Sequence, residues 1–434
     1  METLRRLLIS ILTAEARIVL AKYRPKIVVV TGSVGKTSTK DAIHTVLASR
    51  FKVRKSKKSY NSDIGVPLTI LDCENAWSNP WRWFLNLLKG LALIIFPFRY
   101  PEWLVLEVGA DKPGDLRSLL AWITPDVGVA TLFPDVPPHV EFYVSPEQLW
   151  IEEMLPILSV KGGGLAVVNA DDGCSLSLKD KVANTRVLTY GFFPGSEIRG
   201  GGEEIEYEMK NGRKVPSGIR FSVSYKENSV RVVLNDVIGI QHIYPILAGT
   251  AVGVSEGIAI TDLPQIYAHH KTPPGRMHLI PGIKNTTLID DTYNSSPVAL
   301  REALLALGRV ETSGRRVAIL GDMLELGKYS EEEHHKAGLL AGETVDLLIT
   351  VGTRAREIAD GALDAELSDE AIIQFDDARE AEGPLESLLK DGDIILVKGS
   401  QSMRIERLVE DIMAHPEEKE ELLVRQEKEW VKKF

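Results

Sequence analysis

Short apolar runs alternate with segments of helical periodicity in the first part of the chain. The apolar runs cover residues 27–31, 103–108, 127–130 and 165–168, and helical patterns at 36–49, 116–122 and 146–159 lie between them. Apolar runs of this kind are typical of buried parallel strands, which crossover helices connect. The pattern therefore predicts an α/β fold with a parallel sheet.

The pattern changes to a period of about two between about residues 203 and 236. The segments are Arg220-Phe-Ser-Val-Ser-Tyr225 and Ser229-Val-Arg-Val-Val-Leu234, and only Lys226-Glu-Asn228 separates them. This pattern predicts a hairpin, so a small antiparallel part follows the parallel strands. A helix of small residues is then predicted at 242–257.

A Pro-rich connector at residues 271–275 marks the predicted main boundary. Beyond it, strand and helix patterns alternate again, with strands predicted at 287–289, 317–320, 347–351, 372–375 and 394–397. We therefore predict an N-terminal amphipathic helix (1–25), a central ATP-binding domain (26–272) and a Rossmann-like C-terminal domain (273–434). Residues 416–434 read as a charged helix.

Two apolar segments need a separate explanation. In the first 22 residues, Glu15 and Arg17 interrupt the apolar pattern and no cleavage site follows, which predicts an amphipathic helix rather than a signal peptide. Residues 77–104 contain Lys89 and Pro97, which leaves less than the ~20 apolar residues that span a bilayer. This segment is either an amphipathic helix that covers the sheet or a helix that touches a membrane surface through Trp77 to Phe98.

Composition excludes several classes of function. A formal net charge of −10 argues against nucleic acid as a partner, because no excess of Lys and Arg is available to neutralise phosphates. The two cysteines, Cys73 and Cys174, can form neither a disulfide framework nor a four-thiolate zinc site. We therefore expect a cytoplasmic protein, located at the inner face of the membrane if residues 77–98 contact lipid.

A phosphate-binding turn follows the first predicted strand. Its residues are Gly32, Ser33, Val34, Gly35, Lys36, Thr37 and Ser38. Backbone amides of such a turn bind phosphate oxygens, Lys36 adds a cation, and the Thr37 hydroxyl can ligate Mg²⁺. Val30 stands where the general P-loop pattern has glycine. The turn predicts a bound nucleoside triphosphate.

The form of this turn resembles the Mur ligase family, and further segments in the same order strengthen the resemblance. They are Asn61-Ser-Asp-Ile-Gly-Val-Pro-Leu-Thr69, Glu107-Val-Gly-Ala110, His139 with Glu141, Gly275-Arg276, Ile289-Asp-Asp-Thr-Tyr-Asn-Ser-Ser-Pro297, Leu320-Gly-Asp-Met-Leu-Glu-Leu-Gly327 and Leu396-Val-Lys-Gly-Ser-Gln-Ser-Met-Arg404. The match runs from about residue 26 to residue 413. The C-terminal segments are most similar to the members that add D-alanyl-D-alanine.

The resemblance implies an ATP-dependent ligase that forms an amide bond through an acyl phosphate. It implies that D-alanyl-D-alanine, or a related amino compound, is joined to a peptidoglycan-precursor peptide, with ATP and Mg²⁺ as cofactors. Carried over residue by residue, Lys36, Glu107 and His139 would be catalytic, and Thr37, Glu107 and His139 would bind metal. Hard oxygen ligands suit Mg²⁺.

The resemblance also assigns binding roles outside the turn. On the nucleotide side it points to Arg276, Asp290 and Asn294. On the substrate side it points to Asn61 and Thr69, and to Lys398 and Ser400 for the carboxylate of the incoming amine.

The chain departs from the family pattern in its expected metal-bridging residue. Most members carry a carbamylated lysine shortly after the H-x-E segment, but no lysine lies between His139 and Val160 here. Alignment of the following helix puts Glu153 at that position. A glutamate presents an equivalent pair of oxygens without CO₂, so we expect Glu153, or the neighbouring Glu152, to replace the carbamate.

Two more departures concern ligands. Ile243 stands where the family usually has Asn after the histidine, which leaves His242 as the remaining candidate for an adenine contact. About 26 residues precede the first strand, so we expect the usual N-terminal UDP-binding domain to be lacking. The basic run at residues 52–58 either receives a pyrophosphate or an anionic lipid, or is a solvated strand edge. The alternative to a ligase is a catalytically reduced nucleotide-binding partner of a membrane-associated cell-wall complex.

Overall fold

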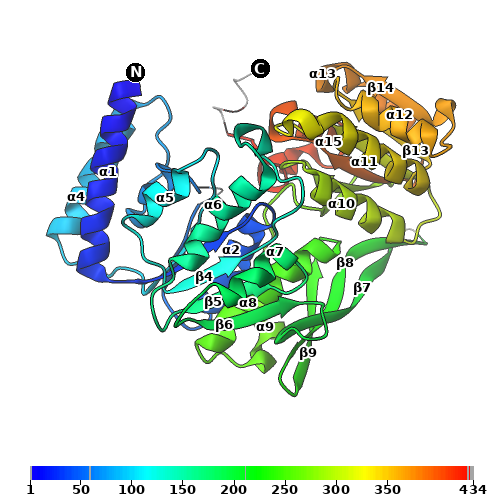
Figure 1. Cartoon of the computed structure of the whole chain (residues 1–434). Coiled ribbons are helices and arrows are strands. Elements are labelled where there is room, and N and C mark those ends of the chain that lie inside the picture. Colours follow the sequence, from blue (N-terminus) through cyan, green and yellow to red (C-terminus); the bar gives the residue numbers. More distant parts are fainter. Residues whose placement is uncertain (1, 58–59, 211, 428–429, 431–434) are drawn as a thin grey trace.

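The computed structural model describes residues 2–57, 60–210, 212–427 and 430, and two sheets organise this part of the chain. Helices lie on both faces of each sheet (Figure 1). The first sheet belongs to the blue-to-green half of the chain and the second to the yellow-to-red part. The predicted α/β fold, with a parallel sheet followed by a small antiparallel part and then a second sheet, is confirmed.

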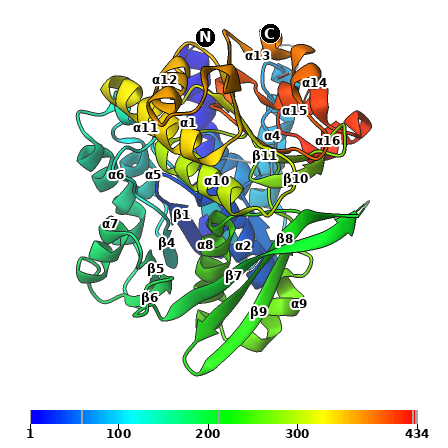
Figure 2. The same ribbon diagram turned by 90° about the vertical axis from the view of Figure 1, so that its right-hand side faces the viewer.

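The first sheet has nine strands in the order β2-β3-β1-β4-β5-β6-β7-β8-β9. It runs parallel from β2 to β7, and β7, β8 and β9 are antiparallel (Figure 2). The strands are β1 (Lys26–Thr31), β2 (Val53–Lys55), β3 (Trp103–Glu107), β4 (Val127–Ala130), β5 (Leu165–Asn169), β6 (Arg186–Gly191), β7 (Ile198–Lys210), β8 (Arg213–Tyr225) and β9 (Asn228–Asn235).

Strand β7 begins earlier than the alternating pattern suggested. Glycines at positions 200–202 interrupt the alternation, and the register with β8 shifts between Gly201 and Glu204. Such a bulge breaks the period of two residues, so the sequence pattern does not reveal the start of the strand. The predicted hairpin of β8 and β9 is confirmed.

Alternate residues of β1 face opposite layers, as the pleat requires. Val28 and Val30 pack with α2 and α8, whereas Ile27 and Val29 pack with α1, α3 and α5. The helices of this half are α1 (Glu2–Tyr23), α2 (Lys36–Ala48), α3 (Gly65–Ile70), α4 (Pro80–Ile95), α5 (Asp115–Leu120), α6 (Pro146–Leu158), α7 (Gly173–Leu176), α8 (Ile243–Ser255) and α9 (Leu263–Tyr267).

The second sheet has the order β10-β11-β15-β12-β13-β14, and it is parallel except for the edge strand β10. Its strands are β10 (His278–Pro281), β11 (Thr287–Asp291), β12 (Arg316–Gly321), β13 (Leu347–Val351), β14 (Ile372–Phe375) and β15 (Ile394–Lys398). One face packs against α10 (Pro297–Arg309), α11 (Ser330–Thr344) and α12 (Arg356–Asp364), and the other against α13 (Ala378–Ala381), α14 (Pro384–Leu388) and α15 (Glu406–Ile412). The domain boundary at residues 272/273 stays a prediction.

Helix α4 packs against α1 at one edge of the molecule (Figure 1). The Lys22 ammonium donates to the carbonyls of Leu93 and Phe96 at 2.9 and 2.7 Å and so closes the C-terminal end of α4. No helix in the described ranges is both long and apolar enough to cross a bilayer.

The C-terminal tail differs from the charged helix predicted at residues 416–434. After α16 (Lys419–Leu422) the helix stops, and Arg425 adopts a φ of 60°. Its guanidinium donates to the carbonyls of Thr292 and Tyr293 and pairs with Glu406 at 3.0 Å. These tertiary bonds of a buried cation outweigh helix propensity, which is a weak preference. Residues 428–429 and 431–434 of this prediction lie outside the described part.

Candidate functional site

The phosphate-binding turn lies at the carboxyl end of β1, between β3 and β4. Strand order reverses direction at this point, where open α/β sheets bind their ligands. Gly32 has a φ of 116°, and a Cβ there would lie 2.3 Å from the Thr131 hydroxyl oxygen. Gly35 has a φ of 89° and directly precedes α2. The two glycines therefore let the chain turn sharply and aim the first amides of α2 at a ligand.

Lys36 and Glu153 meet above this turn. The Lys36 ammonium donates to the carbonyls of Gly32 and Ser33 and lies 3.7 Å from Glu153 Oε1. The Ser33 hydroxyl donates to Glu153 Oε2 at 2.5 Å. Glu153 is 2% exposed, and burial raises the pKa of its carboxyl against the opposing effects of Lys36 and Ser33. A buried carboxylate thus contacts the phosphate-binding turn.

The neighbouring Glu152 points elsewhere. Its Oε1 accepts hydrogen bonds from the backbone amides of Leu116 and Arg117 at 3.0 and 3.3 Å, at the N-terminal end of α5. Of the two glutamates that the sequence offered, only Glu153 reaches the turn. The sequence alone left this choice open because the two glutamates are adjacent residues of the same helix, α6.

Glu107, the last residue of β3, lies beside the first turn of α2. Its Oε1 accepts from the Thr37 hydroxyl at 3.1 Å. Its Oε2 is buried and has no hydrogen-bond partner in the described part of the chain, with the Lys40 ammonium 3.9 Å away. Burial raises the pKa of Glu107, and the positive charges of Lys40 and Lys36 oppose this shift.

These oxygens fit a divalent cation. A buried carboxylate oxygen without a donor, next to a threonine hydroxyl at a phosphate-binding turn, is a suitable pair of hard ligands for Mg²⁺. Across the described ranges, no three His, Cys, Asp or Glu side chains gather as a complete metal site. A cation here would therefore need oxygens from water or a bound ligand as well.

His139 contacts the second half of the chain. It has a φ of 68° and precedes a short 3-10 helix at Val140–Phe142. Its Nδ1 lies 2.5 Å from Glu325 Oε2, which comes from the loop after β12. Burial alone would lower the pKa of His139, but the hydrogen bond and the charge of Glu325 outweigh it, so the pKa is raised.

Glu325 was missed as a site residue. It belongs to the Leu320–Gly327 segment that carried the family resemblance, and that segment was the available signal. The contact between His139 and Glu325 joins segments far apart in the chain, so the local sequence does not predict it.

On the substrate side, the structure brings Asn61 to the turn but not Thr69. A Cβ on Gly109 would lie 3.2 Å from the Asn61 amide nitrogen and 3.4 Å from Lys36 Cε, so these side chains converge above Gly109. Thr69 is buried, and its hydroxyl donates to the carbonyl of Gly65 at 3.0 Å, within α3. Its substrate role stays a prediction.

The residues predicted on the nucleotide side cluster at the end of β11. Asp290 is fully buried and accepts from the Thr292 amide and hydroxyl through Oδ1, while Oδ2 has no hydrogen-bond partner among the described residues. Burial raises the pKa of Asp290 to about 7. The Arg276 guanidinium stacks on Tyr293 at 4.1 Å from the ring centre, and its charge reaches both Glu107 and Asp291. Arg276 therefore lies between the two sheets.

His242 and Asn294 complete this group. His242 is buried before α8, and burial lowers its pKa to about 3, so the imidazole is neutral. The Asn294 side-chain oxygen accepts from the Gln401 amide at 3.3 Å. Their contacts with adenine stay predictions.

Lys398 and Ser400 have partners within the chain. Lys398 is 2% exposed, and its ammonium donates to Asp291 Oδ2 at 2.6 Å and to the Asn294 carbonyl at 2.9 Å. The Ser400 hydroxyl oxygen accepts from the Leu324 amide at 2.9 Å. Both side chains hold loops together here, and binding of the incoming carboxylate stays a prediction.

The basic run at residues 52–58 also has internal partners. Lys55 pairs with Asp41 at 2.7 Å, Lys57 pairs with Glu74 at 3.0 Å, and Arg54 donates to the Ile70 carbonyl. These contacts favour the strand-edge interpretation over a pyrophosphate site. Lys58 lies outside the described residues.

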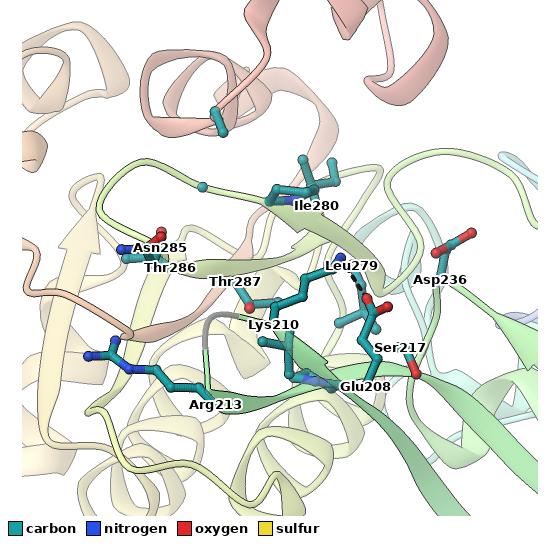
Figure 3. A pocket seen from close by; sticks show the side chains of 15 residues that line it. Glu208, Lys210, Arg213, Ser217, Asp236, Leu279, Ile280, Asn285, Thr286 and Thr287 are labelled. Carbon is teal, nitrogen blue, oxygen red and sulfur yellow. Dashed lines mark ion pairs between the residues drawn. The ribbon is translucent and has the colours of Figure 1, made fainter.

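A groove of about 370 Å³ opens away from the turn, between the β7–β8 hairpin and β10–β11 (Figure 3). Lys210 and Glu208, which line it, pair with each other at 2.5 Å. None of the site residues predicted from the sequence lines this groove. The groove is therefore separate from the predicted site.

Comparison with known families decides the classification. The Mur ligase middle domain matches residues 30–81 and 85–253, and the Mur ligase glutamate ligase domain matches residues 275–401. The chain belongs to the Mur ligase family. This membership confirms the predicted resemblance and the predicted class, a carbon–nitrogen bond-forming ligase.

Individual relatives agree with the family assignment. The UDP-N-acetylmuramoyl-tripeptide--D-alanyl-D-alanine ligase of Bacillus subtilis is 26% identical over 92% of this Mur ligase and 79% of its own length, and the Escherichia coli ligase of the same name is 25% identical over 88% and 76%. MurF from Thermotoga maritima, solved in complex with ADP, is 25% identical with a TM-score of 0.72 and 93% and 82% coverage. MurF from Acinetobacter baumannii shares the fold, with a TM-score of 0.76, 21% identity and coverage of 93% and 80%.

Proposed function

We propose that this Mur ligase uses ATP to join D-alanyl-D-alanine, or a related amino compound, to the carboxylate of a peptidoglycan-precursor peptide. The names of its relatives support the amine and the precursor class. The observation that carries the proposal is the convergence of Lys36, Glu107, Glu153 and the first amides of α2 at the carboxyl end of β1.

The reaction has two steps. A carboxylate oxygen of the peptide attacks the γ-phosphorus, the bond to ADP breaks, and an acyl phosphate forms. The amine nitrogen then attacks the acyl carbon, phosphate leaves, and the amine loses its proton. Lys36 and the amides of the turn bind phosphate oxygens and stabilise the negative charge on these oxygens during transfer of the phosphoryl group.

We infer that Thr37 and Glu107 hold a Mg²⁺ ion at the turn, with His139 as the predicted ligand of a second ion. When bound, Mg²⁺ offsets the repulsion between the triphosphate and the attacking carboxylate. Glu107 Oε2, which accepts no hydrogen bond from the described residues, supports this assignment. His139 now contacts Glu325, so this pair is a link between the ion-binding side and the second sheet.

We infer that Glu153 takes the place of the carbamylated lysine expected in this family. Its carboxylate is buried, accepts from Ser33 and lies 3.7 Å from the Lys36 ammonium. The side chain is therefore held at the turn by two of the residues that are predicted to bind phosphate. A resident carboxylate makes the site independent of CO₂.

Phosphate release tests the proposed reaction. Purified protein is incubated with ATP, Mg²⁺, D-alanyl-D-alanine and a panel of UDP-linked and lipid-linked peptide precursors. We expect release only when both an acceptor and the amine are present, and a loss of about 10²–10³-fold in Lys36→Ala. ATP binding without release in any combination would instead support the nucleotide-binding partner.

A further inference from the structure

Helix α4 carries an apolar stripe that nothing in the described part of the chain covers. Six side chains repeat at intervals of three and four residues along its outer face, and each is between 44% and 66% exposed: Trp81, Phe84, Leu85, Leu88, Leu91 and Ile95. The opposite face is also apolar, with Leu93 buried and Gly90 packed against Glu15 of α1. Arg82, Asn86 and Lys89 form a narrow polar strip beside these faces. A helix with a wide apolar face and basic residues on its polar side is typical of a membrane interface.

Helix α1 and the segment after α4 extend this apolar surface. Leu7, Ile11 and Ile18 of α1 are 57%, 39% and 49% exposed, and they recur at helical spacing. Phe96 and Phe98 follow α4 and are 56% and 51% exposed. The two helices lie side by side at one edge of the molecule (Figure 1). We call these residues, together with the stripe of α4, the α1–α4 surface. Exposed apolar surfaces of this extent mark interaction sites.

The two segments that carry this surface are basic, and of their cations Arg5 and Lys89 pair with Asp63 and Asp72 of the neighbouring segment. Residues 1–24 contain five basic and two acidic residues, and residues 77–100 contain three basic residues and no acidic one, whereas the formal net charge of the chain is −10. Arg17, Arg82 and Arg99 are exposed. Glu15, one of the two acidic residues, faces Gly90 inside the helix pair.

This combination points to a negatively charged lipid surface as the partner. A second copy of the chain docked through the same surface would bring the two sets of basic residues together, because symmetric dimers use the same patch twice. An anionic bilayer offers an apolar layer for the stripe and negative headgroups for the arginines. We propose that the α1–α4 surface docks this protein on anionic membranes, with α4 lying in the interface.

Docking would also place the substrate side of the ligase near the lipid. Arg5 in α1 pairs with Asp63 at 3.5 Å, two residues beyond Asn61, and α1 contacts α3. Asn61 in turn lies beside Lys36 and Gly109. The docking surface and the phosphate-binding turn are thus linked through one short segment. The docking itself does not depend on the proposed reaction.

Vesicle sedimentation with the full chain tests the proposal. We expect binding to mixed phosphatidylcholine–phosphatidylglycerol vesicles, weaker binding to pure phosphatidylcholine, and weakening with salt. Phe84→Ser should lower the affinity at least tenfold, because an exposed ring loses its burial in lipid. Arg82→Gln should lower it about fivefold, the effect of one basic residue near such a surface.

Phe193→Ser is the matched control. Phe193 lies in the loop between β6 and β7 and is 56% exposed, compared with 48% for Phe84. Its replacement should leave vesicle binding unchanged, and circular dichroism should show all three variants folded. The proposal is overturned by an absence of binding to the mixed vesicles, or by equal losses in Phe84→Ser and Phe193→Ser. A wild-type dimer that Phe84→Ser converts to a monomer would overturn it in favour of self-association.

Discussion

Two buried charged side chains at strand ends, one in each sheet, have different hydrogen-bond partners. Lys398 ends the central strand β15 of the second sheet, and its ammonium is bonded to Asp291 and to the Asn294 carbonyl. Glu107 ends β3, next to β1 of the first sheet, and its Oε2 has no hydrogen-bond partner in the described part of the chain. A buried charge with hydrogen-bond partners stabilises the fold, whereas a buried charge that lacks such a partner is suited to bind a ligand.

The difference also separates stability from activity. Because Lys398 and Asp291 complete each other, removal of one leaves the other buried and unpaired. Because Glu107 is incompletely paired, its buried negative charge destabilises the folded state. The raised pKa of its carboxyl has the same cause, which is burial of the charge. We therefore expect opposite consequences from substitutions at the two places.

The largest effect is expected at the second sheet. Asp291→Ala should lower the free energy of unfolding by about 3–5 kcal/mol, because the Lys398 ammonium loses its carboxylate in a buried site. Urea unfolding measures this change. The double variant Asp291→Ala/Lys398→Met should recover much of the loss. A loss below about 1 kcal/mol in the single variant would mean that the pair is not structural.

Substitution of Glu107 should act in the other direction. Glu107→Gln keeps the shape of the side chain and removes the charge that would hold the cation, so phosphate release should fall about 10²–10³-fold. Its unfolding free energy should stay the same or rise, because Lys40 retains its bonds to Ser56 and Asp41. A destabilised Glu107→Gln with normal activity would remove the distinction between the two sheets.

The two adjacent glutamates of α6 sharpen the comparison within the first sheet. Glu153→Gln should lower phosphate release about a hundredfold, because the carboxylate lies at the turn. Glu152→Gln should keep the activity and lose about 1 kcal/mol of stability, because its carboxylate caps α5. Added bicarbonate should change the rate of phosphate release in neither variant. A bicarbonate requirement in the wild type would show that Glu153 does not replace the carbamate.

The smallest effect is expected at Glu15, whose Oε2 is also buried without a partner among the described residues. Glu15 faces Gly90 of α4, and an unpaired oxygen alone should not make a site. Burial raises the pKa of Glu15 from 4.5 to about 7. The folded protein therefore holds a proton that the unfolded chain releases above about pH 4.5, and stability falls as the pH rises from about 4.5 to about 7.

Thermal or urea unfolding as a function of pH measures this contribution. The carboxyl is partly open to water, so screening limits the loss to about 1 kcal/mol. Glu15→Gln should be more stable than the wild type by that amount above pH 7, equal to it near pH 4, and unchanged in phosphate release. Glu227→Gln, in the exposed turn between β8 and β9, is the control. Identical pH curves for Glu15→Gln and the wild type would contradict the assigned pKa.

Much of the architecture and part of the site follow from local sequence. Most strands of the parallel layers were predictable because buried strands are continuous apolar runs, but β2 and β6 were not among the predicted strands. The turn at Gly32 and Gly35 was predictable because only glycine suits its backbone angles. The family motifs named Lys36, Thr37, Glu107 and Asn61, which the fold brings together. Strand β7 escaped because glycines interrupt its alternation.

Tertiary structure alone decided which charged residues are paired. Position in the sequence could not separate Glu153 from Glu152, because a difference of one helical position turns a side chain toward the turn or toward α5. Nor could it show that Lys398 meets Asp291, that His139 meets Glu325, or that Arg425 stops a helix by reaching two distant carbonyls. The sequence determined the periodic elements and the glycine turn because these depend on neighbours along the chain. Pairing and exposure depend on neighbours in space, which is why only the folded molecule shows which apolar residues of α4 stay exposed.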